Sequence, residues 1–279
     1  MNSHPPYRTA IVYDFDGTLA RGNMQDHGLL AELAMDTPGF WRDVDGFAEV
    51  HDCDSTLIYL WCLLDEAKRR NRPITREWLT RQGARIPLFP GVGSWFGRMN
   101  DFARHRDLAL EHYIISSGNH EIIAGTPIYH RFRRVFASKY LYDEAGRAIW
   151  PGIAINYTTK TQYLFRINKG VLNNWDDQRV NRWLPMGERP LPFTRMIFIG
   201  DGQTDIPSMK MVRYQGGFSI AVFDPDRRED KSAQEKTYRL ISEDRVNFVA
   251  PADYRAGSQL EIIVRGIMGR FARDIGYRE

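Results

Sequence analysis

The sequence has few cysteines and no long apolar stretch. Its 279 residues include two cysteines, Cys53 and Cys62. Two cysteines without further closely spaced partners make neither a disulfide scaffold nor a zinc site, so we expect free thiols and, by default, a cytoplasmic protein, with a disulfide between the two as the alternative. The longest wholly apolar run, Leu57 to Leu64, is far shorter than the roughly 20 residues that cross a bilayer. The longest apolar run before the first acidic residue is the short segment Ala10 to Tyr13. We therefore predict no membrane association and no secretory signal.

An excess of charge of one sign is also absent. The 38 Lys and Arg residues nearly balance the 35 Asp and Glu residues, which leaves a net charge of +3. So small an excess does not hold a phosphate backbone, so we expect no nucleic-acid partner. The 43% share of hydrophobic residues is ample for a buried core and excludes a disordered chain. The length predicts one core domain with an insertion or a small companion domain. The oligomeric state does not follow from the sequence.

Three predicted strands stop abruptly at polar residues. The strands are expected at 7–13, 113–115 and 195–199, and the polar segments after them begin at Asp14, Ser116 and Gly200. Further strands are expected at 219–223 and 246–249, a hairpin at 136–149 and a final helix at 258–275. Apolar strands that alternate with helices predict an α/β fold with a parallel sheet covered on both faces. The three polar segments would then meet at the carboxyl edge of that sheet.

The segment between the first two strands is far longer than a crossover needs. Its apolar spacing is helical, which predicts a small inserted helical domain at 21–89 and a core domain formed by 1–20 and 90–279. The insertion is rich in aromatic residues: Phe40, Trp41, Tyr59 and Trp61. We expect these rings to form its core, with an aromatic cage for a quaternary ammonium group as the alternative.

The segment Asp14-Phe15-Asp16-Gly17-Thr18 carries two carboxylates at a strand end. Such a pair can hold a hard divalent cation while one oxygen attacks an electrophile, and the alternative is a solvated turn. Asp201 and Asp205 add two carboxylates at another strand end. Four converging carboxylates repel one another unless a cation is present, so we predict a Mg²⁺ site.

The segment after the second strand suits an anion. This segment precedes the N-terminus of a predicted helix. A phosphate group could bind there to the hydroxyl of Ser116 and the backbone N–H groups of Ser117 and Gly118. A helix N-cap is an equally natural role for Ser116, and the two roles are compatible.

Together these segments resemble the haloacid dehalogenase (HAD) superfamily of phosphohydrolases, whose four motifs occur here in order. Motif one is Asp14-x-Asp16-Gly17-Thr18, motif three is a lysine and motif four is Gly200-Asp201-Gly202-x-x-Asp205. Motif two is Ser116, the first polar residue after the strand, with Ser117 as the alternative. The insertion is similar in position and helical character to the C1-type cap of phosphoserine phosphatase-like members. The resemblance implies a Rossmann-like parallel sheet flanked by helices, with a mobile helical lid.

Two lysines are candidates for motif three. Lys160 stands where a helix is expected to begin, as this lysine usually does in the family, whereas Lys169 precedes the helix-ending Gly170. We favour Lys160. The alternative for Lys169 is a surface lysine that compensates the helix dipole.

The resemblance implies a role for each motif residue. Asp14 would attack phosphorus and form an aspartyl-phosphate, and Asp16 would act as general acid and base. The other implied roles are Mg²⁺ binding by Asp14, Asp16, Asp201 and Asp205, phosphoryl binding by Ser116 and Lys160, substrate contacts by Thr18, Ser117 and Gly118, and a hydrogen bond from Thr18 that orients the nucleophile.

The sequence departs from phosphoserine phosphatases at one position. They usually carry a glutamate nine residues after the nucleophile, where this chain has Asn23. Arg21 nearby is either an exposed hinge residue or a group for a second substrate anion. We therefore predict a Mg²⁺-dependent phosphatase for a small phosphomonoester. The alternatives are a phosphotransferase or mutase on the same site and a non-catalytic binding or regulatory module.

Overall fold

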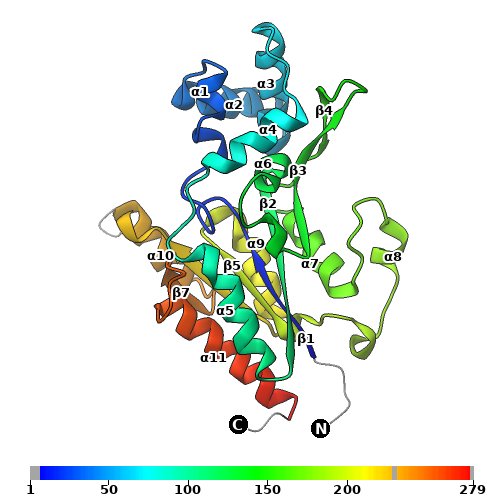
Figure 1. The fold of residues 1–279 in the computed structure, drawn as a ribbon, viewed down its shortest axis with the longest axis vertical. Helices are drawn as coiled ribbons and strands as arrows, with labels where there is room; N and C mark the ends of the chain where they lie inside the picture. Colours follow the sequence, from blue (N-terminus) through cyan, green and yellow to red (C-terminus); the bar gives the residue numbers. More distant parts are fainter. Residues whose placement is uncertain (1–6, 228–230, 277–279) are drawn as a thin grey trace.

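A seven-stranded sheet forms the centre of the protein (Figure 1). The computed structural model describes residues 7–227 and 231–276, so the outermost ends of the expected core domain, 1–6 and 277–279, lie outside it. The strands are β1 (Tyr7–Tyr13), β2 (Leu108–Asn119), β3 (Arg134–Tyr142), β4 (Ala148–Ile153), β5 (Met196–Gly200), β6 (Phe218–Phe223) and β7 (Phe248–Pro251). Their order is β4-β3-β2-β1-β5-β6-β7, and all neighbouring pairs are parallel except β3 with β4. The predicted parallel α/β sheet is confirmed.

Two strands differ from the expectation. β2 is much longer than 113–115, because its first residues pair with β1 from Tyr7 and Leu108 onward. The hairpin at 136–149 exists, but its first strand β3 also pairs in parallel with β2, so β3 belongs to the central sheet. A register shift lies between Ser116 and Asn119, where the chain leaves regular pairing.

Helices cover both faces of the sheet (Figure 1). One apolar core contains residues of α5 (Val92–Arg104) and α11 (Gln259–Asp274), and the other contains residues of α7 (Lys160–Lys169), α9 (Ile206–Tyr214) and α10 (Lys231–Ser242). The shorter elements of the core are α6 (His120–Ala124), η3 (Tyr129–Arg131), α8 (Asp177–Asn181), η4 (Met186–Glu188), η5 (Phe193–Arg195), η6 (Gln203–Asp205) and η7 (Pro225–Arg227). Within residues 7–227 and 231–276, no helix is long and apolar enough to cross a bilayer.

The helices between β1 and α5 lie above the central strands of the sheet in Figure 1, beside the hairpin formed by β3 and β4. They are η1 (Met24–Asp26), α1 (Leu29–Glu32), α2 (Thr37–His51), α3 (Ser55–Arg69), α4 (Arg76–Gln82) and η2 (Gly83–Arg85). The sequence did not lead us to expect α2 as a separate helix. Its start is nevertheless marked by Asp36, whose carboxylate accepts a hydrogen bond from the Gly39 N–H at 2.7 Å, and by Pro38 in the first turn.

The insertion is attached to the core on two sides. On one side its two connecting segments pair in an antiparallel bridge at Ala20 and Leu88, next to which the Arg21 N–H donates to the Pro87 carbonyl at 2.9 Å. On the other side α4 packs against α6, and the Ala148 N–H of β4 donates to the Ile74 carbonyl at 2.8 Å.

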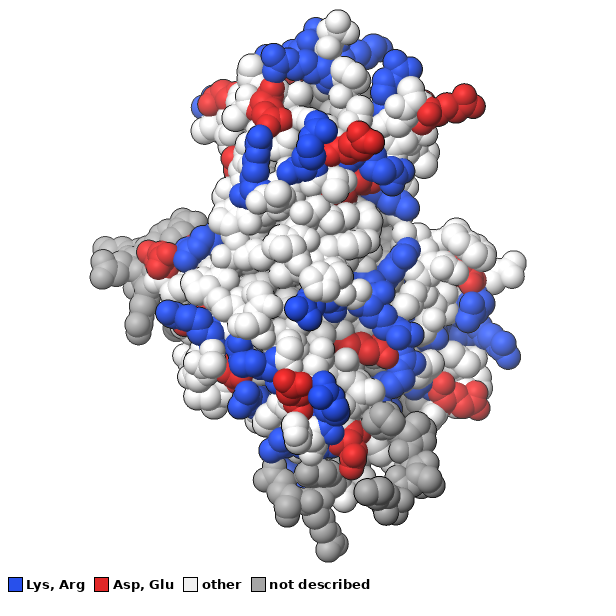
Figure 2. All heavy atoms as spheres, viewed as in Figure 1, with Lys and Arg blue, Asp and Glu red and all other residues white. Residues whose placement is uncertain are grey.

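Both cysteines are free thiols, as expected. Figure 2 shows basic side chains next to acidic ones over both the insertion and the core, so the small net charge is not gathered in one area of this face.

Candidate active site

Three carboxylates meet at the carboxyl ends of β1 and β5. The Asp14 N–H donates to the Ile199 carbonyl at 2.9 Å, which holds the end of β1 against β5. Asp14 and Asp205 are buried, while Asp201 is exposed. One oxygen of each carboxylate lies within 4.8 Å of the others. A cluster of hard oxygen ligands that is open to solvent at one member fits a divalent cation such as Mg²⁺.

Lys160 is the cation of this cluster. It is the first residue of α7, is 1% exposed, and its Nζ lies 3.0 Å from Asp14 Oδ1 and 2.8 Å from Asp205 Oδ1. Lys169 lies at the other end of α7, where its ammonium group donates to the carbonyls of Val180 and Arg182 at 2.6 and 2.8 Å. Of the two candidate lysines, the structure therefore brings Lys160 to the carboxylates.

One ammonium group does not compensate this many acids. Burial, and then the charge of Asp205, raise the pKa of Asp14 to about 7 although Lys160 opposes the shift. Burial and the charge of Asp14 likewise raise the pKa of Asp16 well above its usual value. These shifts mark a place where an additional positive charge would stabilise the ionised carboxylates, which agrees with the donor set for a divalent cation.

Asp16 lies beside the three-carboxylate cluster but does not belong to it. Its Oδ1 accepts a hydrogen bond from the Met24 N–H of the insertion at 2.9 Å, and its side chain lines the same cavity as Asp14. Gly17 makes the turn directly after Asp16 possible. Its φ is +69°, and a Cβ there would lie 2.3 Å from Asp201 Oδ2. A side chain at this position would therefore displace Asp201.

Ser116 is fully buried, and its hydroxyl accepts the Gly118 N–H at 3.0 Å. The helix expected after this polar segment is confirmed as α6, but the alternative role of Ser116 as its N-cap is wrong. The Asn119 side chain accepts hydrogen bonds from the N–H groups of Glu121 and Ile122 at 3.0 and 3.2 Å, so Asn119 is the N-cap. The Gly118 N–H is thus engaged within the turn, and Gly118 does not line the cavity, whereas Ser117 does.

Thr18 does not take the position we expected. It is fully buried and does not line the cavity, and its hydroxyl has no hydrogen-bond partner in the described part of the chain. The hydrogen bond to Asp14 is therefore not formed. The turn at Gly17 directs Thr18 into the core, where its carbonyl accepts the Tyr254 hydroxyl at 2.9 Å.

A cavity of about 700 Å³ joins these residues. Asp14, Asp16, Ser116, Ser117, Lys160 and Asp201 line it from the sheet edge. The insertion contributes Asn23 and Asp26, and the loop after β6 contributes Asp224. Sequence reasoning missed Asp26 and Asp224 as cavity residues, because no local pattern marks which loops fold over the sheet edge.

Side chains of the insertion also hold the edges of the cavity. The Tyr59 hydroxyl of α3 donates to the Ser117 carbonyl at 2.8 Å. Arg21 forms ion pairs of 2.8 Å with both Asp224 and Asp226, and its guanidinium group lies 4.9 Å from the centre of the Phe89 ring. Arg21 is therefore engaged with carboxylates of the core rather than free for a substrate anion.

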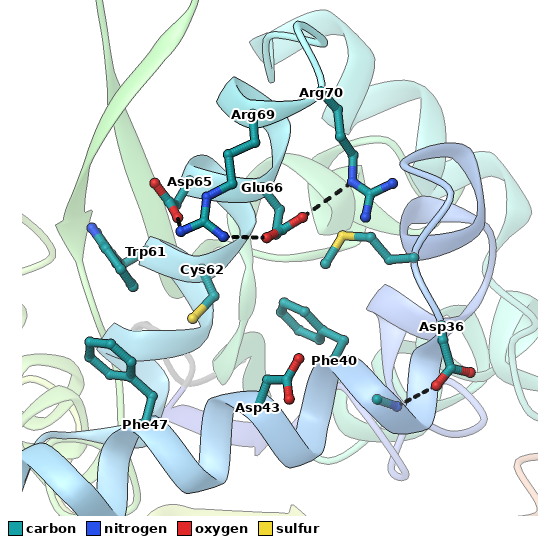
Figure 3. A pocket seen from close by; sticks show the side chains of 12 residues that line it. Asp36, Phe40, Asp43, Phe47, Trp61, Cys62, Asp65, Glu66, Arg69 and Arg70 are labelled. Atoms are coloured by element: carbon teal, nitrogen blue, oxygen red, sulfur yellow. Dashed lines mark hydrogen bonds and ion pairs between the residues drawn. The ribbon is translucent and has the colours of Figure 1, made fainter.

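A second hollow of about 370 Å³ lies within the insertion (Figure 3). Phe40, Phe47 and Trp61 line it, and its two arginines pair with neighbouring acids of α3. Tyr59 is buried and reaches the Ser117 carbonyl instead of this hollow. The four aromatic residues considered for a cage therefore do not surround one site.

Comparison with known proteins shows the family to which this chain belongs. A family model of haloacid dehalogenase-like hydrolases matches residues 11–210. An uncharacterized protein of Borreliella burgdorferi is 26% identical over 275 residues, which cover 90% of this chain and 93% of that protein.

Solved structures show the fold. A HAD family hydrolase of Salmonella enterica matches with a TM-score of 0.52 and 18% identity, over 81% of this chain and 66% of that chain. A probable phosphoserine phosphatase of Vibrio cholerae matches with a TM-score of 0.57 and 13% identity, over 98% of this chain and 70% of that chain. The four motifs, the fold and the family match agree: this chain belongs to the haloacid dehalogenase-like hydrolase family.

Proposed function

We propose that the protein is a Mg²⁺-dependent phosphatase that hydrolyses a small phosphomonoester through an aspartyl-phosphate. The observation that carries this proposal is the contact of Lys160 with Asp14 and Asp205 beside the exposed Asp201 in one cavity. This arrangement offers a carboxylate nucleophile, a fixed cation for phosphoryl oxygens and ligands for a divalent metal ion. A structural neighbour is a probable phosphoserine phosphatase, which supports the same reaction class.

Asp14, Asp201 and the Asp16 backbone carbonyl would hold Mg²⁺, with Asp205 in support. A bound Mg²⁺ would neutralise the acids and the negative charge of the phosphoryl group. Residues 21–89 would act as a cap over this site, because Asn23 and Asp26 close the cavity from that side.

The side chains would then act in two successive displacement steps at phosphorus. An Asp14 oxygen attacks phosphorus, the bond from phosphorus to the alcohol oxygen breaks, and Asp16 donates its proton to that oxygen. Asp16 next takes a proton from water, whose oxygen attacks phosphorus and releases Asp14 and inorganic phosphate. Lys160 and the Ser116 hydroxyl hold phosphoryl oxygens during both steps.

The test is phosphate release from p-nitrophenyl phosphate and a panel of alkyl phosphates with Mg²⁺ and with EDTA. We expect EDTA to abolish turnover and Asp14→Asn to lower kcat/KM by at least about 10³-fold, because no other group replaces the nucleophile. Asp45→Asn, an exposed acid of α2 outside the cavity, is the matched control and should retain full activity.

Two results would contradict the proposal. Turnover that Asp14→Asn leaves intact would remove Asp14 as nucleophile. Transfer of the phosphoryl group to added alcohols in preference to water would make the protein a phosphotransferase on the same site.

A further inference from the structure

The peptide unit between Ser117 and Gly118 is held at both of its polar atoms. Its carbonyl oxygen accepts the hydroxyl of Tyr59, which belongs to α3 of the insertion, at 2.8 Å. Its N–H group points to the opposite side of the same planar unit and donates to the Ser116 hydroxyl oxygen at 3.0 Å. Tyr59 itself does not line the cavity, whereas Ser116 does. The insertion is therefore connected to the serine proposed to hold a phosphoryl oxygen through a single peptide.

The hydrogen bonds of this series all run in the same direction. Tyr59 donates to the peptide carbonyl, the peptide N–H donates to Ser116, and the Ser116 hydroxyl keeps its own proton for a further acceptor. Within the described residues no protein group accepts that proton. Hydrogen bonds that are linked in series polarise one another, so a donor at the Tyr59 end makes the Ser116 hydroxyl a stronger donor. A phosphoryl oxygen in the cavity is the acceptor that would complete the series.

Tyr59 is a fixed donor. Its side chain is 5% exposed, and its ring packs against Trp41 at a centroid distance of 5.8 Å. Burial raises the pKa of Tyr59, so the phenol keeps its proton near neutral pH. Gly118 has no side chain that restricts the peptide, and a Cβ there would lie 2.1 Å from Met24 Cε. The two hydrogen bonds therefore take over the task of fixing the orientation of this peptide.

We propose that Tyr59 is a positioning residue for phosphoryl binding, which acts on the Ser116 hydroxyl through the peptide between Ser117 and Gly118. This inference rests on the proposed function, because it assumes that the phosphoryl group of the substrate lies beside Asp14 and Ser116. Since Tyr59 belongs to α3, Ser116 reaches its full strength as a donor only while the insertion is docked on the core. The insertion thus contributes to phosphoryl binding through a residue that does not touch the substrate.

The experiment removes the first donor of the series and measures phosphate binding. Tyr59→Phe keeps the ring and loses the hydroxyl. With Mg²⁺ and p-nitrophenyl phosphate, we expect KM and the inhibition constant of inorganic phosphate to rise about 5-fold or more, the effect of one lost hydrogen bond. The value of kcat should change less than about 2-fold, because Ser116 binds the phosphoryl group both before and during the reaction. A variant that was merely unfolded in part would lower kcat and leave KM and the inhibition constant unchanged.

Tyr140→Phe is the matched control for docking of the insertion. The Tyr140 hydroxyl of β3 donates to the Leu60 carbonyl of α3 at 2.9 Å. This variant therefore also removes one buried tyrosine hydrogen bond between the insertion and the core, but leaves motif two untouched. Its inhibition constant for phosphate should stay within about 2-fold of the wild-type value.

A double-mutant cycle tests the route through Ser116. In Ser116→Ala the last member of the series is missing, so nothing remains for Tyr59 to act on. Adding Tyr59→Phe to Ser116→Ala should therefore change the inhibition constant for phosphate less than about 2-fold further.

The outcomes separate this inference from the proposed function. The inference is wrong if Tyr59→Phe leaves phosphate inhibition unchanged, if Tyr140→Phe weakens it equally, or if the full effect of Tyr59→Phe persists in Ser116→Ala. In each of these cases hydrolysis of p-nitrophenyl phosphate by the wild type leaves the phosphatase standing. If the wild type hydrolyses no phosphomonoester with Mg²⁺, the proposed function fails and the inference fails with it.

Discussion

Lys160 is a buried cation between buried acids, and its removal should affect both stability and activity. Lys160→Met would leave Asp14 and Asp205 without their ammonium partner. Breaking such a buried group of charges typically costs about 3–5 kcal/mol. We expect Lys160→Met to unfold at clearly lower urea concentration in EDTA, and Mg²⁺ to restore part of the loss because it supplies positive charge to the same acids. In Mg²⁺, kcat/KM should fall about 10²-fold or more.

Lys169→Met is the matched control in the same helix. Its ammonium group contacts only backbone carbonyls away from the cavity, so phosphatase activity should not change. If both variants lost activity equally, the placement of Lys160 as the phosphoryl-binding lysine would be wrong.

His112 is part of a buried polar chain behind the active site. The Trp95 indole N–H donates to the Tyr13 hydroxyl at 2.8 Å, and the Tyr13 hydroxyl lies 3.0 Å from His112 Nδ1. His112 Nε2 lies 3.0 Å from Asn100 Oδ1. This pattern fits a neutral imidazole that carries its proton on Nε2 and accepts the Tyr13 hydroxyl proton at Nδ1. Burial accordingly lowers the pKa of His112 to about 3.

The buried histidine should make stability depend on pH. The unfolded histidine titrates near its usual pKa of about 6.5, so it takes up a proton there while the folded one stays neutral. Stability is therefore full above about 6.5 and falls as the pH decreases toward about 3, by at most about 1.4 kcal/mol per pH unit. Asp14 and Asp16, whose pKa values are raised, take up protons in the folded protein over the same range and give a contribution of opposite sign. The histidine is therefore measured as a difference: in urea unfolding between about pH 7 and 5, stability should fall more, or rise less, with decreasing pH in the wild type than in His112→Gln. Equal slopes would show that His112 does not stay neutral in the fold.

At the scale of elements, α4 and α6 approach so closely that glycine is required at their contact. A Cβ on Gly125 would lie 1.7 Å from the Thr80 carbonyl oxygen, and one on Gly83 would lie 2.2 Å from the Ile122 carbonyl oxygen. Gly125→Ala should therefore push the two helices apart and destabilise the protein by about 1–3 kcal/mol, measured by urea unfolding. Some loss of activity should accompany this change, because α4 belongs to the insertion that closes the cavity.

Gly97→Ala in α5 is the control for helix propensity. Gly97 is exposed, and no atom lies within 4 Å of its added Cβ. There alanine should stabilise the helix by about 0.5–1 kcal/mol. A Gly125→Ala variant that was as stable as Gly97→Ala would contradict the close contact of α4 with α6.

The elements that could be predicted from the sequence are those with a strong local pattern. β1 and β5 are apolar runs that end at acidic turns, and the sequence located both to within one residue. β2 extends beyond its prediction because its first part lacks an apolar run that would mark it as a strand. That part is a strand because it pairs with β1. The N-cap of α6 did not follow from the sequence, because Ser116, Ser117 and Asn119 can each cap a helix and only Asn119 does.

At the scale of the whole molecule, the sequence predicted which motifs meet, and the resemblance implied a cap over them, but neither identified the side chains of the cap and loops that line the cavity. The motif residues converge because parallel strands end at a common edge, which is a general property of such sheets. The pair of Arg21 with Asp224 spans 203 positions along the chain, and the pair of Tyr59 with Ser117 spans 58. No spacing rule connects such residues, so Asp26 and Asp224 emerged as cavity residues only in three dimensions.

The contact of α4 with α6 also limits how this insertion could be exchanged between proteins. The insertion is continuous in sequence, but its docking surface is formed by Gly125, directly after α6, and by the β3–β4 hairpin at Ala148, both encoded far downstream. A chimera that transferred only residues 21–89 to another sheet would lose the glycine on which α4 rests. Recombination at the borders of the insertion should therefore yield poorly assembled hybrids unless the segment from α6 through the hairpin is transferred with it.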